Sequence, residues 1–401
     1  MAPRWCSCSV ALGFCSTSPS IRTRRAVTRR GDRSLRIVLT GGGTGGHIYP
    51  ALAVAESVRR REPSAEIAWL GGSTGPEREI VPAAGLPFQA VTTRKLGRIA
   101  SPETVLVLLA LARGWAEARK FLRRFRPDVL ISAGGYVAGA AVLAAARQRL
   151  PVVVLAGDAV PGRTNRFAAR RATRVCIWFE ETADLLPSRR CVPTGWPIRR
   201  GVVSTQSPEA ARGSLGLDPG RPTVVAVGGS QGARRLNELV LEALSELPGR
   251  AQVLHHTGIR NIEEVRAAAA GRGFAAAHHP RAALSNDEMA MAYRAADVLV
   301  CRCGITTLAE MTAAGCAALM VPLPTAYADH QTANALAIER RGAGILLPEP
   351  QLTGHTLAAR LVDLLEDAPT RESLSRAALA ASRPRAADQI AELACSLPGG
   401  G

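Results

Sequence analysis

The sequence predicts an α/β fold built from two doubly wound parallel sheets. Short apolar runs, typical of buried strands, alternate along the chain with longer segments of helical periodicity. This alternation occurs in two successive series, and in each series the first strand runs into a glycine-rich turn. The pattern breaks from residue 194 to residue 208, where we place a linker. With 401 residues, the chain is long enough for two domains of ordinary size.

The first glycine turn follows a strand expected at 37–39. It holds five glycines between Gly41 and Gly46, then His47 and a helix expected over 51–58. Glycine lets the backbone approach a ligand closely, and a helix N-terminus presents unpaired N–H groups to an anion. We therefore expect the turn to face a phosphate, with His47 at its mouth. The plain alternative is a tight turn with an incidental histidine, and the dinucleotide-binding glycine fingerprint fits the spacing poorly.

The remaining elements of both series follow from the same periodicity. In the first series we expect strands at 67–70, 128–132, 152–155 and 175–178, with helices at 104–125 and 137–148. In the second we expect strands at 223–227, 252–256, 298–301 and 317–321, with helices at 236–247, 305–314, 331–340 and 355–365. A second glycine turn spans 228–232. Two such halves facing each other would form a cleft with anion-binding turns on both walls.

Composition limits the possible functions. The net charge is +17, but residues 1–33 hold seven Arg and one Asp, so the remainder carries +11. Aromatic residues make up only 4% of the chain, which argues against a stacking platform for nucleic acid, and we expect no nucleic-acid partner. The nine cysteines have irregular spacing, which favours reduced thiols over a zinc site. No run of 18 apolar residues exists. Residues 1–33 are interpreted as a disordered extension or a mis-called start.

The expected helix over 104–125 carries a signal of its own. Leu108, Leu111 and Trp115 share one face, and basic residues crowd its second half. This stripe either faces the core, with a solvated basic end, or forms a peripheral contact with an anionic membrane.

Several motifs together resemble the MurG family of bacterial glycosyltransferases, which add N-acetylglucosamine to lipid I. These motifs are GGTGGH at 42–47, GGYV at 134–137, GGSQGA at 228–233, CRCGITTLAE at 301–310 and DHQTANA at 329–335. The resemblance covers nearly the whole chain after the first 33 residues. It implies the GT-B arrangement: two Rossmann-like doubly wound parallel-sheet domains with an interdomain cleft.

The resemblance implies the following boundaries. Residues 34–200 form an acceptor- and membrane-facing domain, and residues 201–370 form a domain that binds the UDP-sugar. Residues 371–401 form a C-terminal helix that crosses back to the first domain.

The resemblance also assigns roles to residues in the second half. The backbone amides of Ile305, Thr306 and Thr307 are expected to bind the UDP diphosphate. Glu310 is expected to accept hydrogen bonds from the ribose hydroxyls, and Arg199 is expected to lie near the nucleotide. Ser230 is expected at the diphosphate, Gln231 among the substrate-binding residues, and His330 and Gln331 at the sugar hydroxyls. On the acceptor side the expected substrate-binding residues are Thr44, Gly45, Gly46, Asp158 and Asn165.

The implied reaction needs no cofactor and no metal, since no D-x-D triplet is found. It is a displacement with inversion at the anomeric carbon, which requires a general base for the acceptor hydroxyl. His47 and Asp158 are the two candidates. An imidazole begins with a pKa of roughly 6.5 and a carboxyl with one of roughly 3.9, so the comparison favours His47 as base and Asp158 as a hydrogen-bond acceptor.

The chain departs from the family pattern on the acceptor side. Leu155 and Ala156 replace the usual His and Glu, Asp158 stands for Asn, and Trp196 stands for the Asn of G-N-P-x-R; Cys303 replaces a serine. The resemblance therefore supports the identity of the donor substrate more strongly than that of the acceptor substrate. A related transferase with another lipid or secondary-metabolite acceptor stays open, as does a non-catalytic paralogue that binds nucleotide-sugar. A nicotinamide-dependent oxidoreductase is disfavoured for two reasons. The first series lacks the acid that dinucleotide-binding folds carry about 20 residues after the glycine turn, and the chain has a second half with its own glycine turn.

The expected partners are UDP-N-acetylglucosamine, undecaprenyl-linked lipid I, the anionic surface of the inner membrane and other wall-synthesis proteins. The expected location is peripheral, on the cytoplasmic face of that membrane.

Overall fold

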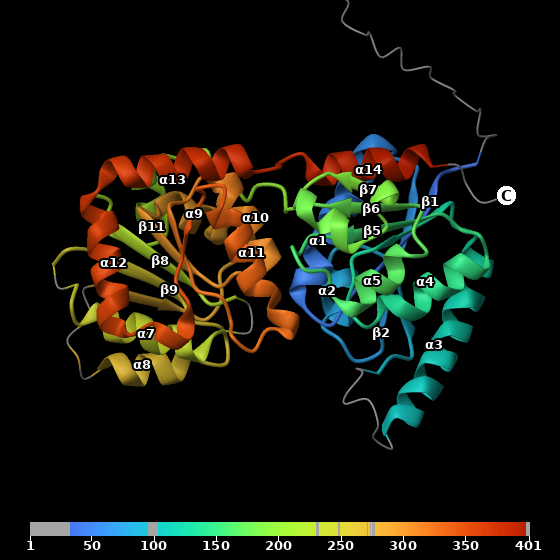
Figure 1. Cartoon of the computed structure of the whole chain (residues 1–401), viewed down its shortest axis with the longest axis horizontal. Coiled ribbons are helices and arrows are strands. Elements are labelled where there is room, and N and C mark those ends of the chain that lie inside the picture. The colour runs from blue at the N-terminus through green and yellow to red at the C-terminus, as the bar shows by residue number, and fades with distance from the viewer. Residues whose placement is uncertain are drawn as a thin grey trace, which may run out of the picture. The chain divides into compact units, whose positions relative to one another are not determined.

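The computed structural model describes residues 33–94, 103–229, 232–247, 249–270, 272, 274 and 277–397, without the side chains of residues 103–105 and 108. The described residues form one seven-stranded and one six-stranded parallel sheet (Figure 1). The prediction of two parallel α/β sheets is therefore confirmed.

The first sheet has the strand order β3-β2-β1-β4-β5-β6-β7. Its strands are β1 (Arg36–Thr40), β2 (Glu66–Gly72), β3 (Phe88–Val91), β4 (Val129–Ser132), β5 (Val152–Ala156), β6 (Arg174–Ile177) and β7 (Cys191–Pro193). The connecting helices are α1 (Gly45–Arg61), α2 (Glu77–Ala83), α3 (Glu103–Phe125), α4 (Ala138–Arg147) and α5 (Arg163–Ala169). The order reverses between β1 and β4, and ligands of open α/β sheets bind outside the carboxyl ends of the strands at such a reversal.

The second sheet repeats this plan with the order β10-β9-β8-β11-β12-β13. Its strands are β8 (Thr223–Val227), β9 (Gln252–His256), β10 (His278–Arg281), β11 (Val298–Cys301), β12 (Ala318–Met320) and β13 (Ile345–Leu346). Its helices are α6 (Pro208–Ser214), α7 (Arg234–Leu244), α8 (Ile262–Ala270), α9 (Asn286–Ala295), α10 (Ile305–Ala314), α11 (His330–Glu339) and α12 (Gly354–Glu366). The reversal lies between β8 and β11, and the CRCGITTLAE motif begins at Cys301, the last residue of β11.

The C-terminal segment differs from the single helix expected within residues 371–401. It forms α13 (Ala368–Ala381) and α14 (Ala386–Ser396), separated by a break that contains Pro384, a residue that cannot continue a helix interior. α13 packs on α10 and α12, whereas α14 packs on α1 (Figure 1). The Asp388 carboxylate accepts hydrogen bonds from Ser57 Oγ and from Arg60, both at 2.8 Å.

Central strands are buried on both faces, as parallel sheets require. Ile37, Val38 and Leu39 of β1 are each fully buried, and their side chains alternate between the two clusters that cover the first sheet. The strands that were predicted from the sequence are those with such apolar runs. The short edge strands β3, β7, β10 and β13 were missed because they are polar or only two to four residues long.

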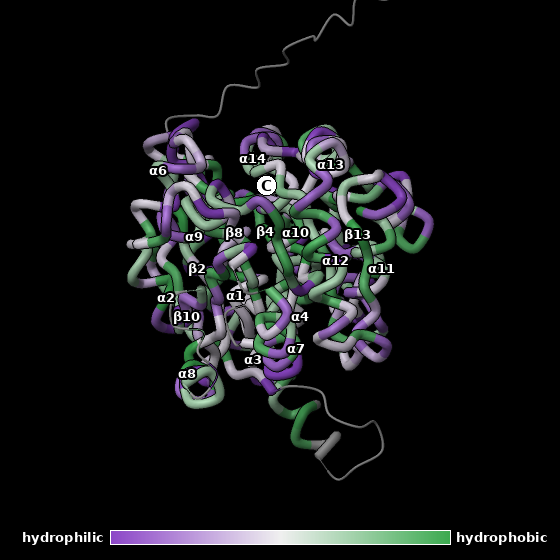
Figure 2. Tube along the Cα trace, turned by 90° about the vertical axis from the view of Figure 1, so that its left-hand side faces the viewer, coloured by the Kyte–Doolittle hydropathy of each residue, from purple (hydrophilic) through white to green (hydrophobic). Residues whose placement is uncertain are grey.

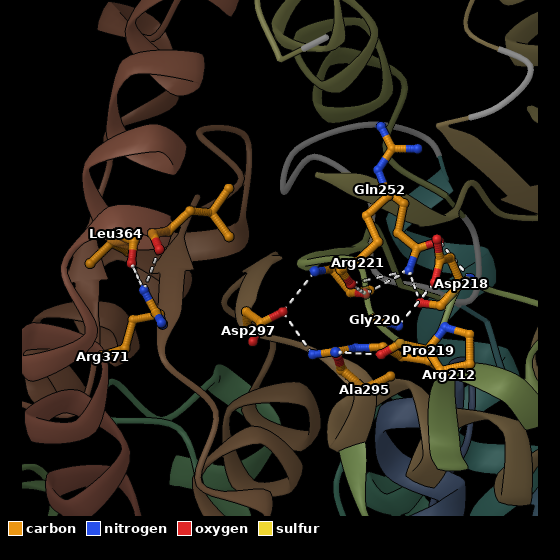
Figure 3. Close-up of polar contacts among 12 residues, drawn as sticks. Arg212, Asp218, Pro219, Gly220, Arg221, Gln252, Ala295, Asp297, Leu364 and Arg371 are labelled. Atoms are coloured by element: carbon orange, nitrogen blue, oxygen red, sulfur yellow. Dashed lines mark hydrogen bonds and ion pairs between the residues drawn. The ribbon is translucent and has the colours of Figure 1, made fainter. Parts of the chain in front are cut away.

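A buried polar network fixes the entry to β8 (Figure 3). The Asp297 carboxylate accepts from the guanidinium of Arg212 at 2.8 Å and from the backbone N–H of Thr223 at 2.7 Å. Arg212 also donates to the carbonyls of Ala295 and Pro219, so its planar group is held from three sides. Gln252 joins the same loop through hydrogen bonds to the backbone of Asp218. These bonds leave the network well satisfied and indicate a structural role.

A buried histidine pair links the two outer strands β9 and β10. The rings of His255 and His278 approach to 3.1 Å, and His255 also contacts Asn237 Oδ1 at 3.1 Å. Burial lowers the pKa of His255 to about 3 and that of His278 to about 4. Both histidines are therefore neutral in the folded protein at pH 7.

We predict that acid destabilises the fold through this pair. Both folded-state pKa values lie below the unfolded value of roughly 6.5, so the unfolded chain takes up protons first and stability falls as the pH drops from about 6.5 toward 4. At pH 5 the loss should be on the order of 2 kcal/mol per histidine. Denaturant unfolding at pH 7 and pH 5 measures it. The double variant His255→Gln/His278→Gln should flatten the pH dependence. An unchanged slope in the double variant would contradict the prediction.

Candidate active site

His47 lies in the first turn of α1, because the helix begins at Gly45 and not at the expected residue 51. Its Nδ1 lies 2.9 Å from the carbonyl oxygen of Ala133, which follows β4. A carbonyl can only accept, so Nδ1 carries the proton in this contact, and Nε2 of the neutral ring keeps its lone pair. Burial lowers the pKa of His47, and the nearby Asp158 carboxylate opposes that shift. The geometry therefore offers a neutral imidazole with one basic nitrogen.

Two glycine turns meet beside this ring. Gly134 and Gly135, which follow β4, have φ values of 92° and 79°. A Cβ on Gly135 would collide with the carbonyl oxygen of Gly42, and one on Gly134 would lie 2.9 Å from Asn165 Oδ1 and 3.3 Å from the His47 ring. Both positions need glycine because the φ values are positive and the space is filled.

Asn165 is brought to the same place by the start of α5. It is buried, and its Nδ2 donates to the Leu155 carbonyl at 3.2 Å. Its Oδ1 has no hydrogen-bond partner among the described residues. An unpaired buried acceptor is costly, so this oxygen is suited to bind a hydroxyl or amide of a ligand.

Asp158 follows β5 and is held by a residue from the second series. Its Oδ1 accepts a hydrogen bond from Asn334 Nδ2 at 2.9 Å. The same Asn334 side chain accepts from the Ala159 N–H at 2.8 Å and donates to the Cys303 carbonyl at 3.3 Å. Asn334 is fully buried and joins the ends of β5 and β11. The sequence placed it in the DHQTANA motif without giving it a role, since its partners lie far away in the chain.

The N-terminus of α10 lies after β11, as the motif predicted. Gly304 is its N-cap, and Ile305, Thr306 and Thr307 form the first turn, whose N–H groups lack intrahelical acceptors. Thr306 Oγ1 accepts a hydrogen bond from the indole of Trp196 at 3.1 Å.

Gln331 and His330 begin α11 near this turn. Gln331 Oε1 accepts from the backbone N–H groups of Cys303 at 3.3 Å and Leu323 at 2.9 Å, so it ties the ends of two neighbouring strands together. His330 contacts the Tyr327 carbonyl at 2.8 Å and is one of the charges that act on His47.

Glu310 is one turn further along α10 and is almost fully buried. Its Oε2 accepts from the Tyr293 hydroxyl at 3.0 Å, and its Oε1 accepts from Arg199 at 3.1 Å. Burial raises the pKa of Tyr293, which keeps its hydroxyl proton available for this bond. Arg199 also contacts Asn286 and stacks over the ring of Tyr49 in α1. Glu310 and Arg199, which the sequence analysis assigned to the same nucleotide site, are thus in direct contact.

The other predicted residues divide into two groups. Thr44 is exposed at the N-cap of α1, and Gly45 and Gly46 lie in its first turn. Ser230, Gln231 and the side chain of Leu108 lie outside the described residues. Among the described residues no group of three or more His, Cys, Asp and Glu side chains could hold a metal ion.

The predicted stripe on α3 divides between core and surface. Leu111 is exposed, as are Leu106 and Leu109, and Figure 2 shows these first turns as hydrophobic. Trp115 instead packs partly against the core, with Arg119 over its ring. A pocket on this helix is lined by Trp115, Ala116, Arg119, Lys120 and Arg123. Within the described part of the chain, no helix has the length and hydropathy needed to cross a bilayer.

Comparison with known proteins covers both sheets. The model of the glycosyltransferase family 28 N-terminal domain matches residues 37–177, and that of the family's C-terminal domain matches residues 223–390. The UDP-N-acetylglucosamine–N-acetylmuramyl-(pentapeptide) pyrophosphoryl-undecaprenol N-acetylglucosamine transferase of Desulforudis audaxviator is 39% identical over 92% of this chain and 100% of its own length. The crystal structure of Acinetobacter baumannii MurG matches with a TM-score of 0.70 and 27% identity, over 90% of this chain and 99% of that one. The calicheamicin glycosyltransferase CalG4, at a TM-score of 0.63 and 16% identity, shows the same fold.

We predict that Asn334→Ala destabilises the protein by about 1–3 kcal/mol, because it leaves the Ala159 N–H and the Asp158 carboxylate without their buried partner. Thermal unfolding of the two proteins measures the effect. Leu336→Ala, at an exposed position of the same helix, is the matched control and should change stability by no more than about 0.5 kcal/mol. Equal stability of the Asn334 variant and the wild type would show that the contact contributes nothing.

Proposed function

Because the chain belongs to glycosyltransferase family 28, we propose that it transfers N-acetylglucosamine from UDP-N-acetylglucosamine to lipid I, giving lipid II for peptidoglycan. One observation carries this proposal: relatives whose names state this activity match at 36–39% identity over about nine-tenths of the chain, both sheets included. Their names specify an N-acetylmuramyl-(pentapeptide) carried on pyrophosphoryl-undecaprenol, and we assign this acceptor to the present chain.

The second sheet binds the donor in this proposal. The N–H groups of Ile305, Thr306 and Thr307 at the start of α10 hold the diphosphate, with the positive end of the helix dipole behind them. Glu310, at 4% exposure, accepts hydrogen bonds from the ribose hydroxyls. Arg199 lies at the nucleotide, while Gln331 and His330 face the transferred sugar. Ser230 and Gln231 of the second glycine turn complete the donor site.

The reaction proceeds without a metal ion or other cofactor in this proposal. As UDP departs, negative charge develops on its phosphate oxygen. Preorganised helix amides stabilise such charge at little reorganisation cost. The α10 amides therefore supply the electrostatic role that a metal takes in other transferases.

The first sheet binds the acceptor and supplies the base. The acceptor hydroxyl oxygen attacks the anomeric carbon from the side opposite the UDP, so the configuration inverts. The new C–O bond forms as the sugar–phosphate bond breaks, UDP leaves with the electron pair, and the hydroxyl proton passes to Nε2 of His47. The lowered pKa of His47 keeps it neutral at pH 7 and ready to accept that proton. Asp158 and Asn165 hold polar groups of the acceptor, while the glycine turn with Thr44, Gly45 and Gly46 faces the acceptor diphosphate.

α3 provides the membrane contact in this proposal. Exposed leucines lie at its start and cations at its end, an arrangement suited to an anionic lipid surface. We place the protein peripherally on the cytoplasmic face of the inner membrane, where it meets its lipid-linked acceptor and other proteins of wall synthesis.

A second candidate is a related transferase with a different acceptor. The buried Trp196 ring packs directly on Gly157, where a Cβ would collide with it. This bulky contact borders Asp158 on the acceptor side, where the chain departs from the family pattern. An altered acceptor pocket is the physical basis for this alternative.

Turnover of the purified full chain with UDP-N-acetylglucosamine and a lipid I analogue tests the proposal. We expect disaccharide product and UDP in equal amounts, with undiminished rate in the presence of EDTA. Product only with another acceptor would support the second candidate. Donor binding without turnover on any acceptor would indicate a non-catalytic protein.

We predict that His47→Ala lowers turnover by ~10²–10⁴-fold, the usual span for loss of a general base. Asp158→Asn should lower turnover far less, because an amide oxygen still accepts the bond from Asn334. Turnover at saturating donor and acceptor compares the two variants. A larger loss in the Asp158 variant would make Asp158 the better candidate for the base.

We predict that replacing Leu106, Leu109 and Leu111 together by Ser weakens binding to vesicles that contain phosphatidylglycerol, since less apolar surface enters the lipid. A separate variant, Arg119→Glu/Lys120→Glu/Arg123→Glu, should also weaken vesicle binding, by ~1 kcal/mol for each cation removed. Co-sedimentation measures binding, and circular dichroism checks the fold. Leu379→Ser, at an exposed site on α13, is the control. Undiminished binding of both folded variants would refute the assignment.

A further inference from the structure

Glu77 is a fully buried carboxylate directly behind the first glycine turn. It opens α2, and its side chain extends to two backbone segments. Oε2 accepts a hydrogen bond from the N–H of Gly43 at 2.9 Å, and Oε1 accepts from the N–H of Gly72 at 3.0 Å. The first bond joins residues 34 positions apart in the chain. It fixes Gly43, whose φ of 84° turns the chain toward α1.

Glycines enclose this carboxylate. A Cβ on Gly42 or Gly75 would collide with the carboxylate, and one on Gly72 would lie 2.9 Å from Oε1. The close fit requires glycine on several sides and leaves little room for another rotamer. A buried charge held by two backbone donors in this way is a fixed feature of the turn.

The turn that Glu77 holds is the one that carries His47. Only three residues separate Gly43 from His47, and a Cβ on Gly43 would lie 2.9 Å from the Tyr136 ring. A shift of Gly43 would therefore move the His47 ring relative to Ala133.

We propose that Glu77 is a positioning residue that sets the place of His47 through the Gly43 backbone and keeps a carboxylate fixed behind its ring. The proposal rests on the proposed function of His47 as general base, and it assigns Glu77 no contact with substrate. Glu77 acts from behind, through the Gly43 N–H, while the opposite face of the turn stays available to the acceptor diphosphate.

The charges around His47 agree with this role. Its titratable neighbours are Asp158 after β5, His330 at the start of α11 and Glu77 itself. Burial lowers the pKa of His47 most, Asp158 and Glu77 raise it, and His330 lowers it. Asp158, the hydrogen bond to Ala133 and, to a smaller extent, Glu77 therefore oppose the effect of burial, and a base that is too weakly basic transfers protons poorly.

Histidine NMR titration of the ligand-free full chain tests the proposal independently of activity, with the His47 signal assigned from His47→Gln. Glu77→Gln removes the charge and keeps the size, so it should move the pKa of His47 downward. Glu77→Asp keeps the charge but is one methylene shorter, so it should leave that pKa nearer the wild-type value. Glu79→Gln, on the exposed face of α2, is the matched control and should leave it unchanged.

Kinetics provides the second readout. In Glu77→Gln, kcat should fall at least ~10-fold while the donor KM changes little, and the acid limb of the kcat profile should move to lower pH. In Glu77→Asp, kcat should fall without that movement of the limb. If the wild type shows no transfer, the proposed function fails, and the titration still decides the role of Glu77.

A folded Glu77→Gln protein with an unchanged His47 titration and unchanged kcat would overturn the proposal. If Glu77→Gln does not fold, Glu77→Asp decides: a folded Asp variant with normal kcat overturns the proposal, and one with reduced kcat supports it. If both variants fail to fold, Glu77 has a structural role in the core, and this result would also overturn the proposal.

Discussion

The close approach of two backbone turns is the constraint on which the site depends. The turns after β1 and β4 meet so closely that a side chain on Gly135 would strike the carbonyl of Gly42. This contact brings Ala133 within 2.9 Å of His47 and so fixes the tautomer of the ring. Parallel register makes the meeting possible, because Thr40 of β1 lies beside Ser132 of β4 and both strands end at the same edge. Glycine is therefore a geometric requirement here and not only a source of flexibility.

The proposed donor half follows a different principle, since the acid assigned to the ribose already has partners within the protein. Glu310 accepts bonds from Tyr293 and Arg199, so both carboxylate oxygens already have partners. Under the proposed function, a ribose that binds Glu310 takes the place of Arg199 at one oxygen, while the Tyr293 bond stays at the other. A carboxylate held by Tyr293 stays oriented during that exchange, which lowers the entropy lost on binding. Arg199, stacked over Tyr49, links this exchange to α1.

The sequence predicted the central strands and both sheets, because buried parallel strands are continuous apolar runs. It also named most of the motif residues that the structure gathers into the candidate site, because glycine motifs mark the ends of strands. It misplaced the start of α1, since glycines are poor helix formers and only the structure shows them in a helical turn. It found neither Glu77 nor Asn334 as site residues. Each binds a backbone group that is distant in the sequence: Glu77 binds Gly43 and Asn334 binds Ala159. The periodicity of apolar residues along the chain does not predict such long-range pairs. The break between α13 and α14 follows from Pro384, which the expected single helix had not taken into account.

The segment between α13 and α14 is a second covalent connection between the two α/β series, because α14 packs on α1 of the first series. The chain passes from the first series to the second through residues 194–207, and it returns through the break at 382–385. Two crossings limit the independent movement of the two series more than a single linker would, and the Asp388 bonds to Ser57 and Arg60 hold α14 in place on α1.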